Sequence, residues 1–211
     1  MTALDIRLIF SYFSIFCSLI LVSSSKAQDF DWPSYGGDNG SSKYAPLSQI
    51  NAENVSRLVT AWEWESPDNA LVSGIIRDGG PMLRPGPFKA TPVVVDGSMY
   101  LPTTYGQIVS LNPVSGQINW IFDTKTYEDG RPTNLGFNVR GVAYWDGGEE
   151  KRIFFATNNS YLWSIDSATG IPDSGFGNDG KIDLTLGLGR PVDRGQYGVV
   201  SPPLVSNNKV V

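Results

Sequence analysis

Few residues in this sequence could do covalent or acid–base chemistry. The 211 residues include no histidine and one cysteine, Cys17. Without histidine, a Ser-His-Asp triad, a Cys-His nucleophile and a histidine-ligated zinc ion are excluded within these residues. Cys17 lies in an apolar N-terminal run, so the rest of the chain has neither a thiolate nucleophile nor a disulfide. No catalytic residue can be named from the sequence.

The composition is that of a globular protein with many turns. Hydrophobic residues make up 41% of the chain and charged residues 18%, and the 23 glycines and 14 prolines argue against long helices. The formal net charge is −5, and Lys and Arg are not clustered. Because a nucleic-acid site needs such clusters, we expect no nucleic acid among the partners.

Residues 1–27 are predicted to be a cleaved signal peptide. Arg7 supplies a positive flank, the apolar run Leu8–Val22 follows, and small residues end the segment. This order predicts cleavage before Gln28 and a periplasmic location. A retained membrane anchor is the alternative, but the run of 15 residues is shorter than the roughly 20 that span a bilayer.

The segment 28–90 is expected to lead into the regular part of the fold. Turn formers come first, followed by a short helix over Ala52–Leu58 with Asn51 as its N-cap. Val59–Glu65 then alternates with its two tryptophans on one face, which predicts a strand. The stretch Ser66–Phe88 is rich in glycine and proline, so we expect a long, poorly packed loop.

A repeat follows this segment. Thr91–Asp123 contains four short apolar runs separated by turn signals, among which Asp96-Gly97 is a strong hairpin dipeptide. A second copy covers Gly141–Phe176, and a third begins at Ser201. The expected strands are Pro92–Val95, Met99–Thr103, Gln107–Leu111 and Asn119–Phe122 in the first copy, and Val142–Trp145, Arg152–Thr157 and Tyr161–Ile165 in the second.

The two copies share a turn. Leu111–Gly116 matches Ile165–Gly170, 54 residues later. In each turn an Asn or Asp side chain can accept hydrogen bonds from backbone amides, and the glycine suits the left-handed position. Trp120 is expected to lie over the turn of the neighbouring unit and bury its ring between units. In the second copy the nearest aromatic residue is Phe176.

This period predicts an all-β fold, a β-propeller of four-stranded antiparallel blades. Residues 91–211 would form about two blades and the start of a third. A β-sandwich also has short strands and turns, but the matched turn at a fixed period favours the propeller. Since propellers close with roughly four to eight blades, we expect the chain to be the truncated, N-terminal part of a longer ring.

Three stretches carry a family resemblance. The opening W-x-x-Y-G-G-D-x-G-S-S-K-Y-A-P-L-x-Q-I-N, the run A-T-P-V-V-V-D-G-S-M-Y and the run N-V-R-G-V-A-Y-W resemble the start of dehydrogenases that depend on pyrroloquinoline quinone (PQQ). The resemblance covers Asp31–Val211. The pieces R-I-F-F-A-T, G-F-G-N-D-G-K-I-D-L and S-P-P-L-V are closer to the glucose and polyol branch, and the vicinal cysteine pair of the methanol branch is absent.

The resemblance implies an eight-bladed propeller that holds PQQ and a Ca²⁺ ion on its axis. The complete enzyme would oxidise a hydroxyl of a sugar, polyol or alcohol, and its electrons would pass to a membrane quinone or to cytochrome c. Ca²⁺ takes oxygen ligands and would polarise the reactive carbonyl. A peripheral contact with the membrane is an open alternative.

The resemblance assigns two cofactor-binding candidates. Arg140 falls on the family's cofactor-binding arginine, and its planar guanidinium suits a carboxylate; the alternative is a surface or inter-blade arginine. Lys89 would either pair with a cofactor carboxylate or mark a changed pocket. Val200 replaces a threonine, and Gly136 lies near a stacking histidine of relatives. The calcium ligands and the catalytic aspartate are expected beyond Val211.

A second function remains open at this point. A non-catalytic periplasmic propeller scaffold of the outer-membrane assembly type uses the same blade turn and is also exported. A periplasmic propeller that binds sugar or lipid is a third reading. Fold alone cannot separate these alternatives. The long opening segment and the N-V-R-G-V-A-Y-W stretch favour the enzyme.

Overall fold

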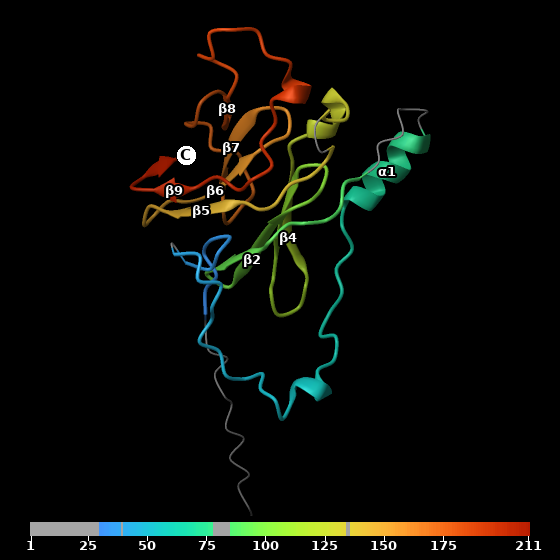
Figure 1. Cartoon of the computed structure of the whole chain (residues 1–211), viewed down its shortest axis with the longest axis vertical. Helices are drawn as coiled ribbons and strands as arrows, with labels where there is room; N and C mark the ends of the chain where they lie inside the picture. Colours follow the sequence, from blue (N-terminus) through green and yellow to red (C-terminus); the bar gives the residue numbers. More distant parts are fainter. Residues whose placement is uncertain (1–29, 39, 78–84, 134–135) are drawn as a thin grey trace, which may run out of the picture.

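The computed structural model describes residues 30–38, 40–77, 85–133 and 136–211 (Figure 1). The predicted signal peptide and its cleavage before Gln28 lie outside the described residues and stay predictions. No helix within the described ranges is long and apolar enough to cross a membrane.

Two four-stranded antiparallel sheets and a hairpin follow one another along the chain (Figure 1). Each sheet has its strands in sequence order, and we call the sheets blade 1 and blade 2. Blade 1 consists of β1 (Val93–Val95), β2 (Ser98–Pro102), β3 (Gln107–Leu111) and β4 (Ile118–Asp123). Blade 2 consists of β5 (Ala143–Asp146), β6 (Lys151–Ala156), β7 (Tyr161–Asp166) and β8 (Lys181–Asp183). The separate hairpin consists of β9 (Val205–Ser206) and β10 (Lys209–Val210). The all-β fold with four-stranded antiparallel units is confirmed.

The core lies between the two blades. The β1–β2 turn places Asp96 at φ 50° and Gly97 at φ 70°, the left-handed pair that a two-residue hairpin needs. The resulting register directs alternate residues of each strand inward. One continuous apolar cluster contains Val93, Val95, Tyr100 and Ile108 of blade 1, Ile153, Phe155 and Ile165 of blade 2, and Val139 and Val142 from the segment before β5.

The shared turn has the predicted geometry in both blades. The Asn112 Oδ1 accepts hydrogen bonds from the amides of Val114 and Ser115 at 2.9 and 3.1 Å. The Asp166 Oδ1 accepts those of the equivalent residues of blade 2 at 3.1 and 2.8 Å. Gly116 and Gly170 close the turns at φ 70° and 74°. Side-chain capping and a left-handed glycine therefore explain the repeated sequence.

Trp120 of β4 packs on the turn of blade 2, as predicted. Its Nε1–H donates to the Ser167 carbonyl at 3.0 Å, and a Cβ at Gly170 would lie 2.7 Å from its ring. Two positions later in β4, Phe122 meets Trp163 edge-on with a centroid distance of 5.0 Å. The outer strand of blade 1 thus covers the face of blade 2.

The segment before blade 1 repeats this contact. The Trp62 Nε1–H donates to the Pro113 carbonyl at 3.1 Å, and a Cβ at Gly116 would lie 2.5 Å from the Trp62 ring. Trp64 packs on the apolar cluster of Leu101, Val109 and Leu111. The predicted strand Val59–Glu65 is nevertheless wrong, because this segment has no partner strand among the described residues. It is an extended segment in the place of an outer strand.

Two further expectations are corrected. The helix predicted over Ala52–Leu58 is a turn followed by a 3₁₀-helix, η1 (Val55–Arg57), although the Asn51 Oδ1 does accept from the Glu53 amide at 3.0 Å. The predicted loop contains the helix α1 (Asp68–Arg77), which packs on the apolar residues described below. The first error comes from a local N-cap signal, and the second from glycine and proline content, whereas tertiary contacts decide both.

The fourth strand of blade 2 lies later than expected. The second repeat was predicted to end at Phe176, but β8 begins at Lys181. Phe176 stays within its own blade, where it packs on Phe154 with a centroid distance of 5.6 Å. The remaining helices are short 3₁₀-helices, η2 (Thr126–Asp129) and η3 (Arg194–Gln196).

Candidate functional site

The segments that lead into β1, β5 and β9 lie side by side. The Thr91 amide donates to the Arg140 carbonyl at 2.8 Å, and the Arg140 amide donates to the Val200 carbonyl at 3.0 Å. Each of these residues precedes the first strand of its unit. The structure therefore brings the starts of three successive units to one place, with Arg140 in the middle.

The backbone of Arg140 is held by hydrogen bonds on both sides, but its side chain forms none with the described residues. Asn138 and Val139, which precede it, are both 3% exposed. The Arg140 side chain is exposed, and its guanidinium has no hydrogen-bond or ion-pair partner among the described residues. Such a guanidinium can bind an anionic ligand in a bidentate manner. The side chain therefore does not pair between blades, and the choice between a surface arginine and a cofactor-binding arginine stays a prediction.

Lys89 lies on the neighbouring segment. It is exposed and also lacks a polar partner in the described part of the chain. Three residues earlier, Gly86 touches the segment of Arg140, because a Cβ at Gly86 would overlap the Phe137 carbonyl oxygen. The segments of Lys89 and Arg140 are thus joined at Gly86–Phe137 and again at Thr91–Arg140. Two unpaired cations therefore lie just before the first strands of the two blades.

The two departures from the family pattern have structural consequences. Val200 contributes its carbonyl to the Arg140 amide, and a valine side chain offers no hydrogen bond to a ligand. Gly136 is buried at φ 67°, and a Cβ there would lie 3.2 Å from the Arg131 Nε. A larger residue at position 136 would be strained, so a stacking side chain at this position does not suit the backbone.

A buried helix start behind this site was missed from the sequence. Asp68, the first residue of α1, is 5% exposed. Its Oδ1 accepts from the Thr103 hydroxyl at 2.6 Å and from the Gln107 Nε2 at 3.0 Å. Its Oδ2 accepts from the Thr104 hydroxyl at 2.9 Å and from the Tyr105 amide at 3.2 Å. The signal that could have found it is Ser66-Pro67-Asp68, which is typical of a helix N-terminus.

A small aromatic cluster lies beneath α1. Tyr105 and Phe137, both 0% exposed, meet edge-on with a centroid distance of 4.8 Å. Leu71 and Val72 of α1 pack against this pair. Burial, together with the charge of Asp68, raises the pKa of Tyr105 to about 12, so its hydroxyl stays neutral at physiological pH.

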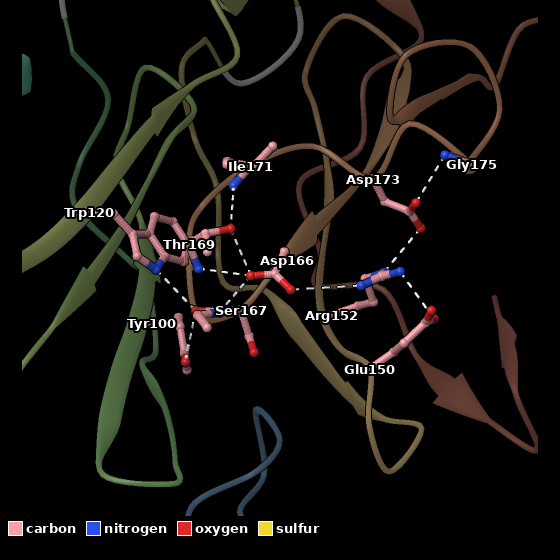
Figure 2. Close-up of polar contacts among 11 residues, drawn as sticks. Tyr100, Trp120, Glu150, Arg152, Asp166, Ser167, Thr169, Ile171, Asp173 and Gly175 are labelled. Carbon is pink, nitrogen blue, oxygen red and sulfur yellow. Dashed lines mark hydrogen bonds and ion pairs between the residues drawn. The ribbon is translucent and has the colours of Figure 1, made fainter.

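A second polar network joins the turn after β7 to blade 1 (Figure 2). The Arg152 Nε and Nη2 pair with Asp173 and Glu150 at 3.0 and 3.1 Å, and its Nη1 lies 3.9 Å from the Asp166 Oδ2. Asp166 caps the turn whose Ser167 carbonyl receives the Trp120 indole. Every charged group of this network has a partner within it, so we assign it to blade packing rather than to chemistry.

No metal centre is present within the described ranges. They contain no group of three or more His, Cys, Asp or Glu side chains placed to hold an ion. The side chains available before β1 and β5 are instead cationic, since Lys89 and Arg140 have no polar partner in the described part of the chain. Nearby, the buried Asn138 Oδ1 accepts no hydrogen bond from the described residues. This arrangement fits an organic anion that also carries a donor group.

Comparison with known proteins identifies the family. Residues 32–211 match the family described as "PQQ: Glucose/ethanol/alcohol dehydrogenase, beta-propeller domain". The chain belongs to this family. It is 29% identical over 198 residues to the quinoprotein glucose dehydrogenase of Gluconobacter oxydans, with 86% of this chain and 23% of that protein covered. It is 31% identical over 146 residues to the dehydrogenase subunit of a quinone-dependent alcohol dehydrogenase of the same species, with 66% of this chain and 16% of that subunit covered.

Solved structures agree with the propeller prediction. The quinohemoprotein alcohol dehydrogenase of Comamonas testosteroni superposes with a TM-score of 0.64 at 25% identity, over 86% of this chain and 22% of that chain. The chain spans about a quarter of the length of the curated relatives it matches. The β-propeller fold and the family of quinoprotein dehydrogenases are therefore confirmed.

Proposed function

We propose that this chain contributes the first blades of a periplasmic PQQ- and Ca²⁺-dependent dehydrogenase and holds part of the cofactor site. The observation that carries the proposal is the exposed guanidinium of Arg140, which has no partner in the described part of the chain and stands where three units begin. A non-catalytic scaffold has no need of such a cation beside a second one, Lys89.

Arg140 and Lys89 would bind carboxylates of PQQ. Arg140 suits a bidentate contact, whereas Lys89 supplies a point charge on a flexible stem. When bound, PQQ accepts the electrons of the substrate hydroxyl. The described residues contain no group of three or more His, Cys, Asp or Glu side chains placed to hold a metal ion. The family resemblance implies that the catalytic aspartate and the Ca²⁺ ligands lie in further blades, so we expect residues 28–211 alone to show no turnover.

The substrate class follows from the relatives. Their names include quinoprotein glucose dehydrogenase, quinone-dependent alcohol dehydrogenase and glycerol dehydrogenase. We infer that the complete protein oxidises a hydroxyl of a sugar, polyol or alcohol and passes electrons to a quinone or a cytochrome. Export is part of the proposal and rests on the signal sequence. It requires that the secreted protein begin at Gln28, which N-terminal mass spectrometry measures.

Reconstitution tests the proposal. The full-length protein is purified without cofactor and then supplied with PQQ, Ca²⁺, glucose, glycerol or ethanol, and a redox dye. We expect turnover only when both PQQ and Ca²⁺ are present, and no turnover by residues 28–211 alone. Failure of the full-length protein to bind PQQ would instead support the scaffold alternative.

A further inference from the structure

Asp68 has more contacts than are needed to begin a helix. Its carboxylate is 5% exposed and accepts four hydrogen bonds, all from neutral donors in the β2–β3 loop and at the first residue of β3. No cation pairs with it among the described residues. A buried carboxylate is costly unless its oxygens are fully satisfied, so these donors are held in one arrangement around it.

The β2–β3 loop does not need this carboxylate in order to form. In blade 1 the Thr103 amide donates to the Gln107 carbonyl at 2.7 Å, and in blade 2 the equivalent Thr157 amide donates to the Tyr161 carbonyl at 2.8 Å. The backbone of the β6–β7 loop is therefore the same, although the described residues place no buried carboxylate against it. The additional feature of blade 1 is that Asp68 fastens α1 to the loop.

A chain of contacts leads from Asp68 to the cofactor candidates. Asp68 binds the Tyr105 amide, and the Tyr105 ring packs edge-on against Phe137 at 4.8 Å. The Phe137 carbonyl lies against Gly86, so closely that no side chain fits there. Phe137 and Gly86 each lie three residues before a cation, Arg140 and Lys89 respectively. Any shift of Phe137 would therefore move both segments.

We propose that Asp68 is a positioning residue for PQQ binding, which acts through Tyr105 and Phe137 on the segments that carry Arg140 and Lys89. This inference rests on the proposed function. Asp68 touches no cofactor in this account. It fixes the distance between α1 and the β2–β3 loop. Because Phe137 packs between residues of these two elements, its position is fixed as well. Nothing in the sequence around Arg140 points to a residue 72 positions earlier.

The test measures affinity for PQQ rather than activity. Asp68→Ala, Asp68→Asn and Gly86→Ala are made in the full-length protein. Dissociation constants for PQQ are then obtained by tryptophan-fluorescence titration at a fixed Ca²⁺ concentration. We expect Asp68→Ala to weaken binding roughly tenfold, the scale on which residues behind a ligand-binding group act. Asp68→Asn keeps one oxygen and should recover part of the affinity, and Gly86→Ala should weaken binding by separating the two segments.

Asp166→Ala is the matched control. Asp166 also accepts bonds from backbone amides and a hydroxyl, but it caps the outer turn of blade 2. It should lower the melting temperature and leave the PQQ dissociation constant unchanged. If Asp68→Asn and Gly86→Ala bind PQQ like the wild type while Arg140→Ala does not, Asp68 has a structural role only and the inference is overturned. If Arg140→Ala also binds normally, the proposed cofactor site itself is wrong.

Discussion

The backbone and the side chain of Arg140 have separate roles. Its carbonyl accepts from Thr91 and its amide donates to Val200, so the residue joins the starts of β1, β5 and β9. Its guanidinium is exposed and has no partner in the described ranges. An arginine needed only to join blades could use its backbone alone. The side chain is therefore free to bind a ligand, as the proposed function requires.

Lys89 provides a test of charge at the same place. Lys89→Glu should weaken PQQ binding at least tenfold, since it replaces attraction to an anion by repulsion over a short distance. Lys89→Gln should have a smaller effect because it only removes the charge. Titration of both variants with PQQ measures these changes in the dissociation constant. Equal affinities for the wild type and Lys89→Glu would show that Lys89 is a surface residue outside the site.

Acid stability should depend on Asp183. A hydrogen bond from the Arg194 guanidinium, with further bonds from Thr185, holds the pKa of Asp183 well below the ordinary value of 3.8. A depressed pKa contributes stability above the unfolded-state value, and this contribution is lost as the pH falls through the folded-state value. Asp183→Asn should therefore lower the melting temperature at pH 7 and approach the wild type below about pH 4.

The control for this experiment is Asp179→Asn. Asp179 is exposed at φ 52°, a conformation that asparagine also adopts readily, so this variant should follow the wild type at every pH. A melting-temperature difference between wild type and Asp183→Asn that stays constant from pH 7 to pH 3 would contradict the account of the ion pair.

Among the structural elements, the segment of Trp62 and strand β4 are equivalent. Trp62 lies on Gly116 as Trp120 lies on Gly170, and both indoles donate to the carbonyl that follows the capping Asn or Asp. Trp64 and Phe122 then cover the face of the next sheet. The equivalence extends the repeat to a part of the chain in which the described residues form no sheet.

This equivalence predicts similar energetics. Trp62→Ala and Trp120→Ala should each destabilise the protein by about 2–3 kcal/mol, less than a fully buried tryptophan, because both rings are partly exposed. Denaturant unfolding of the two variants measures the effect, with Val114→Ala, at a residue 84% exposed, as the neutral control. A loss for Trp120→Ala without one for Trp62→Ala would show that the segment is not an outer strand.

The sequence predicted those elements whose signals are local. The first seven strands were predicted to within about a residue at each end. Their signals are the alternation of apolar and polar residues, the Asp96-Gly97 turn and the capped turns, and each signal depends only on residues close in sequence. The helix α1 and the late strand β8 were missed. The position of α1 depends on Asp68 reaching the β2–β3 loop 35 residues away, a contact that no local pattern records.

The candidate site was only partly accessible to sequence reasoning. Arg140 and Lys89 came from a family resemblance, and composition or spacing alone would not have separated them from other surface cations. Their adjacency depends on Thr91, Gly86 and Phe137, which the fold brings together from distant positions. The proposed positioning role of Asp68 could not be read from the sequence motif that contains Arg140, because Asp68 lies 72 positions earlier.

At the scale of the whole molecule, the described residues supply two cations of the proposed site, from the starts of three successive units. They hold no group of three or more His, Cys, Asp or Glu side chains placed to bind a metal ion. The chain covers about a quarter of the curated relatives' length, so the remaining ligands would come from further blades. A ring arrangement places the starts of all first strands around one axis, which is where a cofactor shared by several blades would lie.

The most direct test of this account is PQQ binding by Arg140 variants of the full-length protein. Arg140→Ala should lose a charge-assisted bidentate contact of about 1.5 to 3 kcal/mol, which corresponds to a roughly 10-fold to 150-fold rise in the dissociation constant. Arg140→Lys should recover part of the loss, since a point charge cannot make both bonds. Identical PQQ titrations for the wild type and Arg140→Ala would contradict the central claim that this arginine binds the cofactor.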